Sequence, residues 1–213
     1  MIVASPPVMR SAILLDNISW QTYEILLEAF QDQRGLRLTY DCGKLEIMTP
    51  LAPHEGYKKL VGRCIETVTE EFNINIRSLG SLTCRRQDLA KGLEPDQCYY
   101  ITNEARVRDL EQINLDRDPP PDLIIEIDIT SSSLDRMSLY LALGVPEVWC
   151  YDGERLQFYA LQEQSYQIVE RSPTFTFLSP HDILRFIEQR ATIGETALIR
   201  SFRQWVREQV RDA

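Results

Sequence analysis

The sequence predicts an α/β or α+β fold, a mixed β-sheet flanked by helices in a single domain over residues 1–213. Segments with the two-residue periodicity of strands alternate with segments of helical periodicity. The 213 residues suffice for one full hydrophobic core, and 44% of them are hydrophobic. No internal repeat and no low-complexity tract divides the chain. Strands and helices that alternate in this way are typical of a layered fold around one core.

The first half of the chain predicts two helices and a hairpin. Residues 1–17 are expected to form a loose N-terminal arm. Ser19 is expected to cap the first helix, and Gly35 to end it. A turn at 41–43 has the composition of a hairpin turn. The predicted elements are a helix from Trp20 to Gly35, strands over 36–40 and 44–48, and a helix over 53–72.

The second half predicts further strands and three helices. In order these are one or two strands over 74–88, a strand over 97–102, a charged connection over 103–121, a strand over 122–130, a helix capped by Ser132 or Ser133 and ended by Gly144, a strand over 145–152, a hairpin over 155–170, and two closing helices within 179–213. The last helix is expected to begin at Thr192, which forms a capping box with Glu195. Its apolar stripe, with Phe202 and Trp205, predicts core packing or a homodimer face.

The strand over 122–130 is the most informative segment. Three prolines precede it, and they favour an extended conformation. Its isoleucines and the apolar residues on both faces predict a central, buried strand. Glu126 and Asp128 lie on one face of this strand, about 6.6 Å apart. Because buried like charges repel and lose hydration, a metal ion or a basic side chain is expected opposite them.

The composition narrows the kind of partner and the kind of metal. The net charge is 23 − 32 = −9, which argues against broad attraction to DNA or to an anionic membrane while leaving a local basic groove open. Five scattered cysteines without a C-x-x-C pair predict free thiols in a reducing cytoplasm. No apolar run is long enough to span a membrane, so a cytoplasmic protein without a membrane partner is expected. With only two histidines, any metal should be a hard ion held by carboxylates.

Two acids on separate predicted strands are candidate ligands for such an ion. Asp96 follows Pro95 at the start of one strand, and Glu126 lies in the middle of another. If the strands pair, both carboxylates can bind one divalent ion, which can activate a water molecule. Asp122 also follows a proline, but it lies about 13 Å from Glu126 along the same strand. Asp96 can also be read as a turn residue, and His54, on an apolar helical stripe, as a core or a catalytic histidine.

The segments GLEPDQCYYI, PPDLIIEIDITSSS and DRMSLYLALGVPEVWCYDG, in this order, resemble the Uma-type family of restriction-endonuclease-like proteins. This family belongs to the PD-(D/E)XK nuclease superfamily, and the resemblance runs from about Trp20 to Leu178. It implies a restriction-endonuclease-like core and a DNA endonuclease that depends on Mg²⁺, for which Mn²⁺ can substitute. By position, Asp96 matches the aspartate of the PD element and Glu126 the first acid of the (D/E)XK element.

The chain departs from this pattern at the motif lysine. Two residues after Glu126 stands Asp128, and family members that lack the lysine there carry one four residues before a tyrosine on the following helix. In this chain Arg136 has that place, four residues before Tyr140. An arginine can hold a phosphate oxygen, but it stays protonated and cannot act as a base. We expect Arg136 to pair with a site carboxylate in the absence of metal, with Asp128 either assisting as a ligand or pairing with Arg136 or a nearby lysine. The alternative is a nuclease-fold protein that binds or regulates without turnover.

Overall fold

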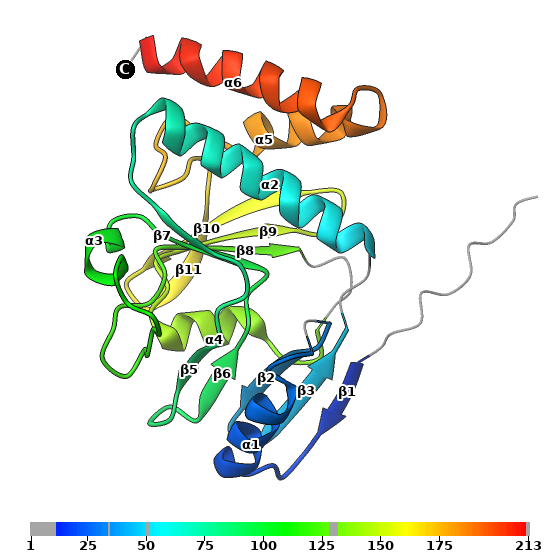
Figure 1. Cartoon of the computed structure of the whole chain (residues 1–213), viewed down its shortest axis with the longest axis vertical. Coiled ribbons are helices and arrows are strands. Elements are labelled where there is room, and N and C mark those ends of the chain that lie inside the picture. Colours follow the sequence, from blue (N-terminus) through cyan, green and yellow to red (C-terminus); the bar gives the residue numbers. More distant parts are fainter. Residues whose placement is uncertain (1–11, 34, 50–51, 128–131, 212–213) are drawn as a thin grey trace, which may run out of the picture.

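The computed structural model describes residues 12–33, 35–49, 52–127 and 132–211. Within these ranges the chain forms two β-sheets with helices packed against them, which confirms the predicted fold class (Figure 1). The strands are β1 (Ala12–Leu15), β2 (Arg37–Asp41), β3 (Lys44–Met48), β4 (Arg77–Leu79), β5 (Cys84–Arg86), β6 (Lys91–Leu93), β7 (Gln97–Tyr100), β8 (Leu123–Ile127), β9 (Glu147–Tyr151), β10 (Leu156–Gln162) and β11 (Ser165–Val169). The helices are α1 (Trp20–Phe30), α2 (Ala52–Glu71), α3 (Glu104–Val107), α4 (Arg136–Leu143), α5 (Pro180–Ile187) and α6 (Glu195–Arg211), with a 3-10 helix, η1 (Glu188–Ala191), between the last two. None of the described helices is long and apolar enough to cross a membrane.

The larger sheet has the strand order β11-β10-β9-β8-β7-β4 and lies between α2 on one face and α4 on the other (Figure 1). Strand β8 pairs antiparallel with β7 and parallel with β9, and all five of its residues are buried. Ile125 and its alternate neighbours belong to the apolar cluster beneath α2, whereas Ile124 belongs to the cluster around α4. Because side chains alternate along a strand, Glu126 shares the face of Ile124. The predicted central strand is therefore confirmed over its described part.

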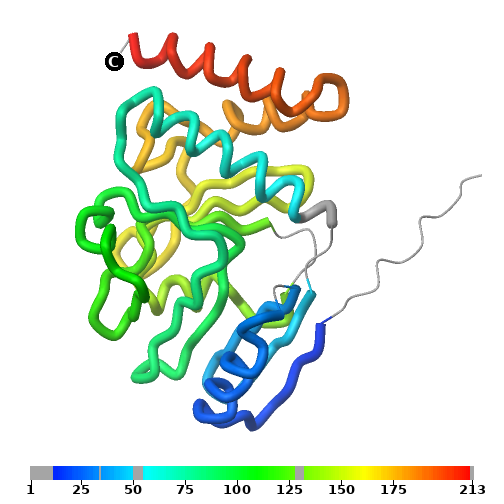
Figure 2. Tube along the Cα trace, viewed as in Figure 1, coloured from blue at the N-terminus to red at the C-terminus, as the bar shows by residue number. Residues whose placement is uncertain are grey.

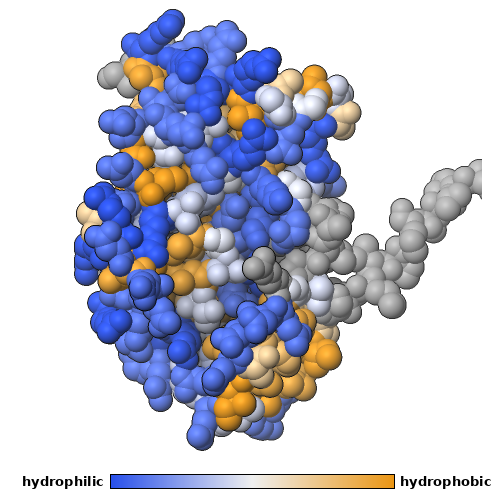
Figure 3. Space-filling model, in the orientation of Figure 1, coloured by the Kyte–Doolittle hydropathy of each residue, from blue (hydrophilic) through white to orange (hydrophobic). Residues whose placement is uncertain are grey.

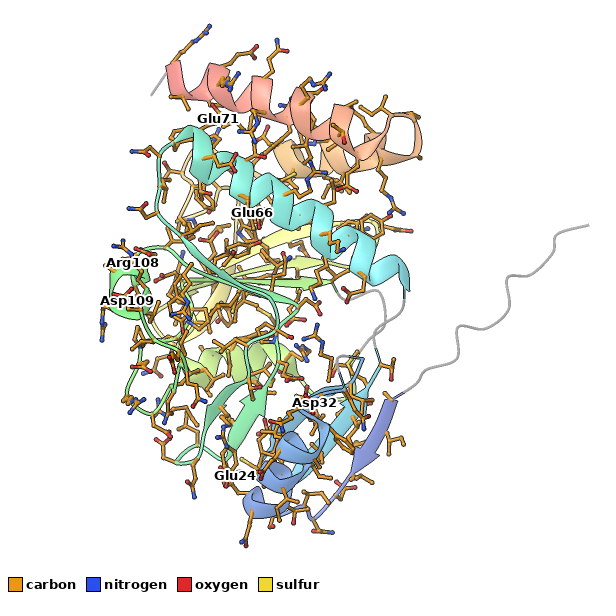
Figure 4. All side chains as sticks on the ribbon, in the orientation of Figure 1. Glu24, Asp32, Glu66, Glu71, Arg108 and Asp109 are labelled. Atoms are coloured by element: carbon orange, nitrogen blue, oxygen red, sulfur yellow. The ribbon has the colours of Figure 1, made fainter. Side chains whose placement is uncertain are left out.

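The two C-terminal helices cover the outer side of α2 (Figure 2). Phe202 of α6 is fully buried, and the partly buried Trp205 packs against it with ring centroids 5.6 Å apart. At the end of α2, labelled in Figure 4, Glu71 accepts hydrogen bonds from Arg203 at 2.6 Å and Arg207 at 2.8 Å. The apolar stripe of α6 is thus covered within one chain, as the core-packing alternative predicted.

The smaller sheet has the strand order β1-β3-β2-β6-β5, and α1 packs against it (Figure 1). The predicted hairpin forms its centre as β2 and β3, which pair antiparallel from Arg37 opposite Met48 to Asp41 opposite Lys44. Tyr23 of α1 is fully buried on this sheet. The expected hairpin is therefore part of a complete second sheet, and that sheet lies beside α4, which contacts β5 and β6 (Figure 1).

Three elements differ from the expectations for the N-terminal half. Part of the expected loose arm, Ala12–Leu15, is strand β1, because it pairs with β3 along four residues; residues 1–11 lie outside the described ranges. The turn expected before the 97–102 strand includes strand β6, which is only three residues long and so shows no periodicity. The charged connection over 103–121 contains the short helix α3. The apolar side chains of β1 are exposed at the edge of the sheet, where Figure 3 shows an apolar patch.

Two helix starts also differ from the predicted ones. Helix α4 is capped by Asp135, whose side chain accepts from the Ser138 amide, so neither Ser132 nor Ser133 is the cap. Helix α6 begins at Glu195 instead of Thr192, because the preceding residues form the 3-10 helix η1 and the Thr192 hydroxyl donates to a carbonyl of that helix. The predicted end of α4 is confirmed, since Gly144 has the left-handed conformation with φ of 74°.

Candidate active site

The pairing of β7 with β8 brings the two predicted ligands together. Asp96 directly precedes β7, in which Gln97 lies opposite Ile125, so the antiparallel register places Asp96 beside Glu126. The Asp96 carboxylate accepts a hydrogen bond from the Ile127 amide at 2.8 Å, which fixes it on the neighbouring strand. Both acids are buried, with 5% and 6% of their surfaces exposed. The strands therefore place two carboxylates side by side in a position with little water.

Burial of Glu126 favours its protonated form, whereas the neighbouring guanidinium of Arg136 favours its ionised form. Burial raises the pKa of Glu126, the Arg136 guanidinium opposes this, and the nearby Asp96 charge raises the pKa again. The net direction is upward. Burial also raises the pKa of Tyr140 far above its usual value, so this phenol stays protonated and donates a hydrogen bond to Glu126 Oε1. Glu126 is thus held by two donors at one oxygen.

Arg136 is the basic partner of Glu126, as predicted for a site without metal. Its Nη2 donates to Glu126 Oε1 at 2.7 Å and to the Glu94 carbonyl at 2.8 Å, and its Nη1 donates to Thr39 Oγ1 at 3.0 Å. The side chains of the pair are only 14% and 8% exposed. Burial is the largest single effect and would lower the pKa of Arg136, but the charges of Glu126, Tyr140 and Asp96 and the hydrogen bond to Glu126 together outweigh it, and the net shift is upward. Arg136, the first residue of α4, therefore stays charged, and these contacts hold its guanidinium beside Glu126.

A second arginine, which the sequence argument missed, faces the other acid. Arg37 of β2 lies with its Nη2 3.9 Å from Asp96 Oδ1, and its Nη1 donates to the Pro95 carbonyl at 3.2 Å. Only 6% of Arg37 is exposed. We call Arg37, Asp96, Glu126 and Arg136 the arginine–carboxylate cluster. The signal in the sequence was the alternation of Arg37 and Thr39 with apolar residues in a strand, which predicts a polar face that needs buried partners.

A family model named Uma2 and described as "Putative restriction endonuclease" matches residues 20–193. The chain belongs to this family. Among solved structures, a similar chain is a "putative nuclease belonging to DUF820 from Anabaena variabilis ATCC 29413", with 20% identity and a TM-score of 0.50. The alignment covers 70% of this chain and 89% of that chain, and at this identity it shows a shared fold alone. A search of curated proteins found no match.

Membership of the Uma2 family agrees with the expected restriction-endonuclease-like core, and the matched range contains the whole arginine–carboxylate cluster. The other predicted site residues have different outcomes. Asp128 lies outside the described residues. His54 falls within α2, but its side chain is likewise outside the described part of the structure.

The second Pro-Asp pair is structural. The buried Asp122 carboxylate accepts hydrogen bonds from the backbone amides of Ile101 at 2.7 Å and Asn103 at 3.0 Å, and from the Asn103 side chain at 2.8 Å. These bonds fix the turn that follows β7. Because its oxygens are engaged with this turn, Asp122 is a poorer candidate ligand than Asp96, in line with the choice made from the sequence.

The donor set fits a hard divalent ion. Mg²⁺ is usually bound through one or two carboxylates and keeps several waters, and Asp96 with Glu126 supplies such a pair. Each carboxylate already faces a guanidinium, at 3.9 Å and 2.7 Å, so an ion bound there would have to compete with these contacts. Among the described residues, no group of three or more His, Cys, Asp or Glu side chains is arranged to hold a metal. An ion at this position would therefore be held through these two carboxylates and water.

Proposed function

We propose that this protein is a Mg²⁺-dependent nuclease that hydrolyses phosphodiester bonds in DNA. The observation that carries the proposal is the adjacency of two buried acids, Asp96 and Glu126, across the β7–β8 pair, with a charged arginine against Glu126. Its support from the comparisons is membership of the family described as "Putative restriction endonuclease". Mn²⁺ is expected to substitute for Mg²⁺, because both prefer oxygen ligands.

Each residue has a distinct role in this proposal. Asp96 and Glu126 would hold the ion, which when bound supplies a Lewis acid and lowers the pKa of a water molecule. The Ile127 amide orients Asp96 through its 2.8 Å hydrogen bond. Arg136 would stabilise negative charge on the phosphate, and because it stays protonated it is not the general base. Asp128 as an assisting residue and His54 as a catalytic residue remain predictions.

A second candidate is a nuclease-fold module that binds DNA without cleaving it. The observation in its favour is the same contact, Arg136 Nη2 to Glu126 Oε1 at 2.7 Å. An arginine at this place satisfies the carboxylate that the metal needs and offers no base. In this alternative the arginine–carboxylate cluster stabilises the fold, and DNA binding does not depend on a divalent ion.

Plasmid nicking distinguishes the two candidates. Supercoiled plasmid is incubated with the protein in Mg²⁺, Mn²⁺ or EDTA, and the nicked fraction is followed with time. The wild-type protein should nick with either ion and not in EDTA, and the isosteric variants Asp96→Asn and Glu126→Gln should each be slower by roughly a hundredfold or more. The matched control is Asp88→Asn, a surface aspartate paired with Arg86, which should leave the rate unchanged.

Two results would contradict the proposed nuclease. Nicking by Asp96→Asn at the wild-type rate would remove Asp96 from the site. Binding of a labelled duplex without nicking in any ion, measured by fluorescence anisotropy, would support the second candidate instead.

A further inference from the structure

The β2–β3 hairpin makes three separate contacts with the segments that carry the site. From β2, Thr39 accepts from Arg136 at 3.0 Å, and Arg37 approaches Asp96. From β3, the buried Glu46 accepts from the Ser132 hydroxyl and the Ser133 amide, both at 2.6 Å. Thr39 and Glu46 are cross-strand partners, so these contacts come from one face of the smaller sheet. This face of the smaller sheet is therefore in direct contact with the candidate site.

Arg37 of the hairpin brings a positive charge close to Asp96 and has no assigned role in catalysis. Its guanidinium is buried, lies 3.9 Å from Asp96 Oδ1 and donates to the Pro95 carbonyl that precedes Asp96. Its Nε is buried without a hydrogen-bond partner among the described residues. A buried guanidinium that is not fully satisfied by hydrogen bonds is held by charge, and the nearby charge is that of Asp96.

The charges of the arginine–carboxylate cluster balance only when no metal is bound. When both carboxylates are ionised, their charges and those of the two arginines sum to zero. A divalent ion added to this arrangement leaves an excess of two positive charges in a buried position, where charge interactions are weakly screened. The ion must therefore compete with the guanidiniums for the carboxylates, and the excess positive charge then favours an anion such as a phosphodiester.

We propose that Arg37 is a resident counter-ion of Asp96 that competes with the divalent ion for this carboxylate and, when the ion is bound, favours the phosphate. It is a positioning residue that acts through Asp96. The inference rests on the proposed function, because it takes Asp96 as a metal ligand. We therefore expect removal of Arg37, although it belongs to the site, to raise the affinity for the divalent ion.

The test is calorimetric titration of Mn²⁺ into the full-length protein and its variants. Arg37→Gln should bind Mn²⁺ roughly tenfold more tightly than the wild-type protein, because one repelling charge is gone. Arg37→Lys keeps the charge and should bind within about threefold of wild type. The matched control is Arg85→Gln on the same sheet, whose exposed partner is Glu24 at 2.5 Å; its Mn²⁺ affinity should not change.

Thermal unfolding gives an independent readout. Without metal, Arg37→Gln should have the lower melting temperature because the buried Asp96 loses the guanidinium beside it, and Mn²⁺ should raise it by more than it raises that of wild type. If Arg37→Gln does not fold, the double variant Arg37→Gln with Asp96→Asn should recover folding because neither charge remains. A double variant that also fails to fold overturns the proposed pairing.

The outcomes separate this inference from the proposed function. Equal or weaker Mn²⁺ binding by Arg37→Gln, with clear binding by wild type, overturns the inference alone. Absence of Mn²⁺ binding in both proteins overturns the metal-dependent function and the competition together. Tighter binding by Arg37→Gln, with Arg37→Lys near wild type, supports both.

Discussion

Replacement of Arg136 by alanine is the perturbation whose energetic effect the structure defines best. The change removes one partner of an ion pair whose side chains are 14% and 8% exposed, and it leaves Glu126 buried without the guanidinium that favours its ionised form. Breaking a buried pair in this way costs about 3–5 kcal/mol. For a chain of 213 residues, each kcal/mol shifts the melting temperature by roughly 2–4 °C, so the expected loss is about 6–20 °C.

Urea unfolding in EDTA, followed by tryptophan fluorescence, measures this loss. The fully buried Trp149 lies on β9, beside β8, and so its fluorescence should report unfolding of this sheet. Arg200→Ala on the exposed side of α6 is the control and should change the free energy of unfolding by less than about 0.5 kcal/mol. A loss below about 1 kcal/mol for Arg136→Ala would show that the pair behaves as a solvated surface pair, and the described geometry of the site would then be wrong.

The same variant separates phosphate stabilisation from metal binding. Nicking should fall strongly whereas Mn²⁺ affinity should not fall, since the proposed partner of Arg136 in turnover is the phosphate and its guanidinium competes with the ion for Glu126. Nicking by Arg136→Ala equal to that of the parent protein at the same Mg²⁺ concentration would remove this residue from the mechanism.

Three further predictions concern parts of the fold that support the site. Phe202→Ala should lower the free energy of unfolding by about 3–5 kcal/mol in urea titrations, because the ring is fully buried between α6 and its neighbours; a loss under 1 kcal/mol would contradict that packing. Hydrogen bonds from the arginines of α6 lower the pKa of Glu71, so its stabilising effect should be present above the usual carboxyl pKa and lost as the pH falls through the lowered value; stability curves of wild type and Glu71→Gln that stay apart in strong acid would refute this. Gly92→Ala should be destabilising by about 1–3 kcal/mol, since the added methyl would meet Tyr23 ring carbons at 2.9 Å, and an unchanged melting temperature would show that Tyr23 can move aside.

Elements with a local signal could be predicted from the sequence, and those that depend on pairing with distant segments could not. The apolar alternation of β8 and the left-handed glycine that ends α4 are local features, and both predictions hold. Strand β6 has three residues, too few to show a period, and it exists because it pairs with β5 and with β2. Strand β1 owes its position to pairing with β3, a contact between segments far apart in the chain.

The site could be predicted as far as its motifs extend. Asp96 and Glu126 follow motif spacing, and Arg136 follows from its place before Tyr140 on the next helix. Arg37 and Glu46 could not be assigned, because their partners lie far along the chain, outside their own strands, and only tertiary packing joins them. Ser132 and Ser133 have the composition of helix caps, yet in the fold their hydrogen bonds go to Glu46, a competition that local sequence does not reveal.

In the proposed nuclease, Asp96 and Glu126 together hold one divalent ion. The most direct test is anomalous diffraction from crystals of the wild-type protein soaked in Mn²⁺, with data collected near the manganese absorption edge. We predict one anomalous peak within bonding distance of both carboxylates, about 2.0–2.3 Å. We also expect that Arg136 Nη2 no longer lies 2.7 Å from Glu126 Oε1. Crystals of a protein that nicks DNA in Mn²⁺, but with no peak between these two side chains, would contradict it.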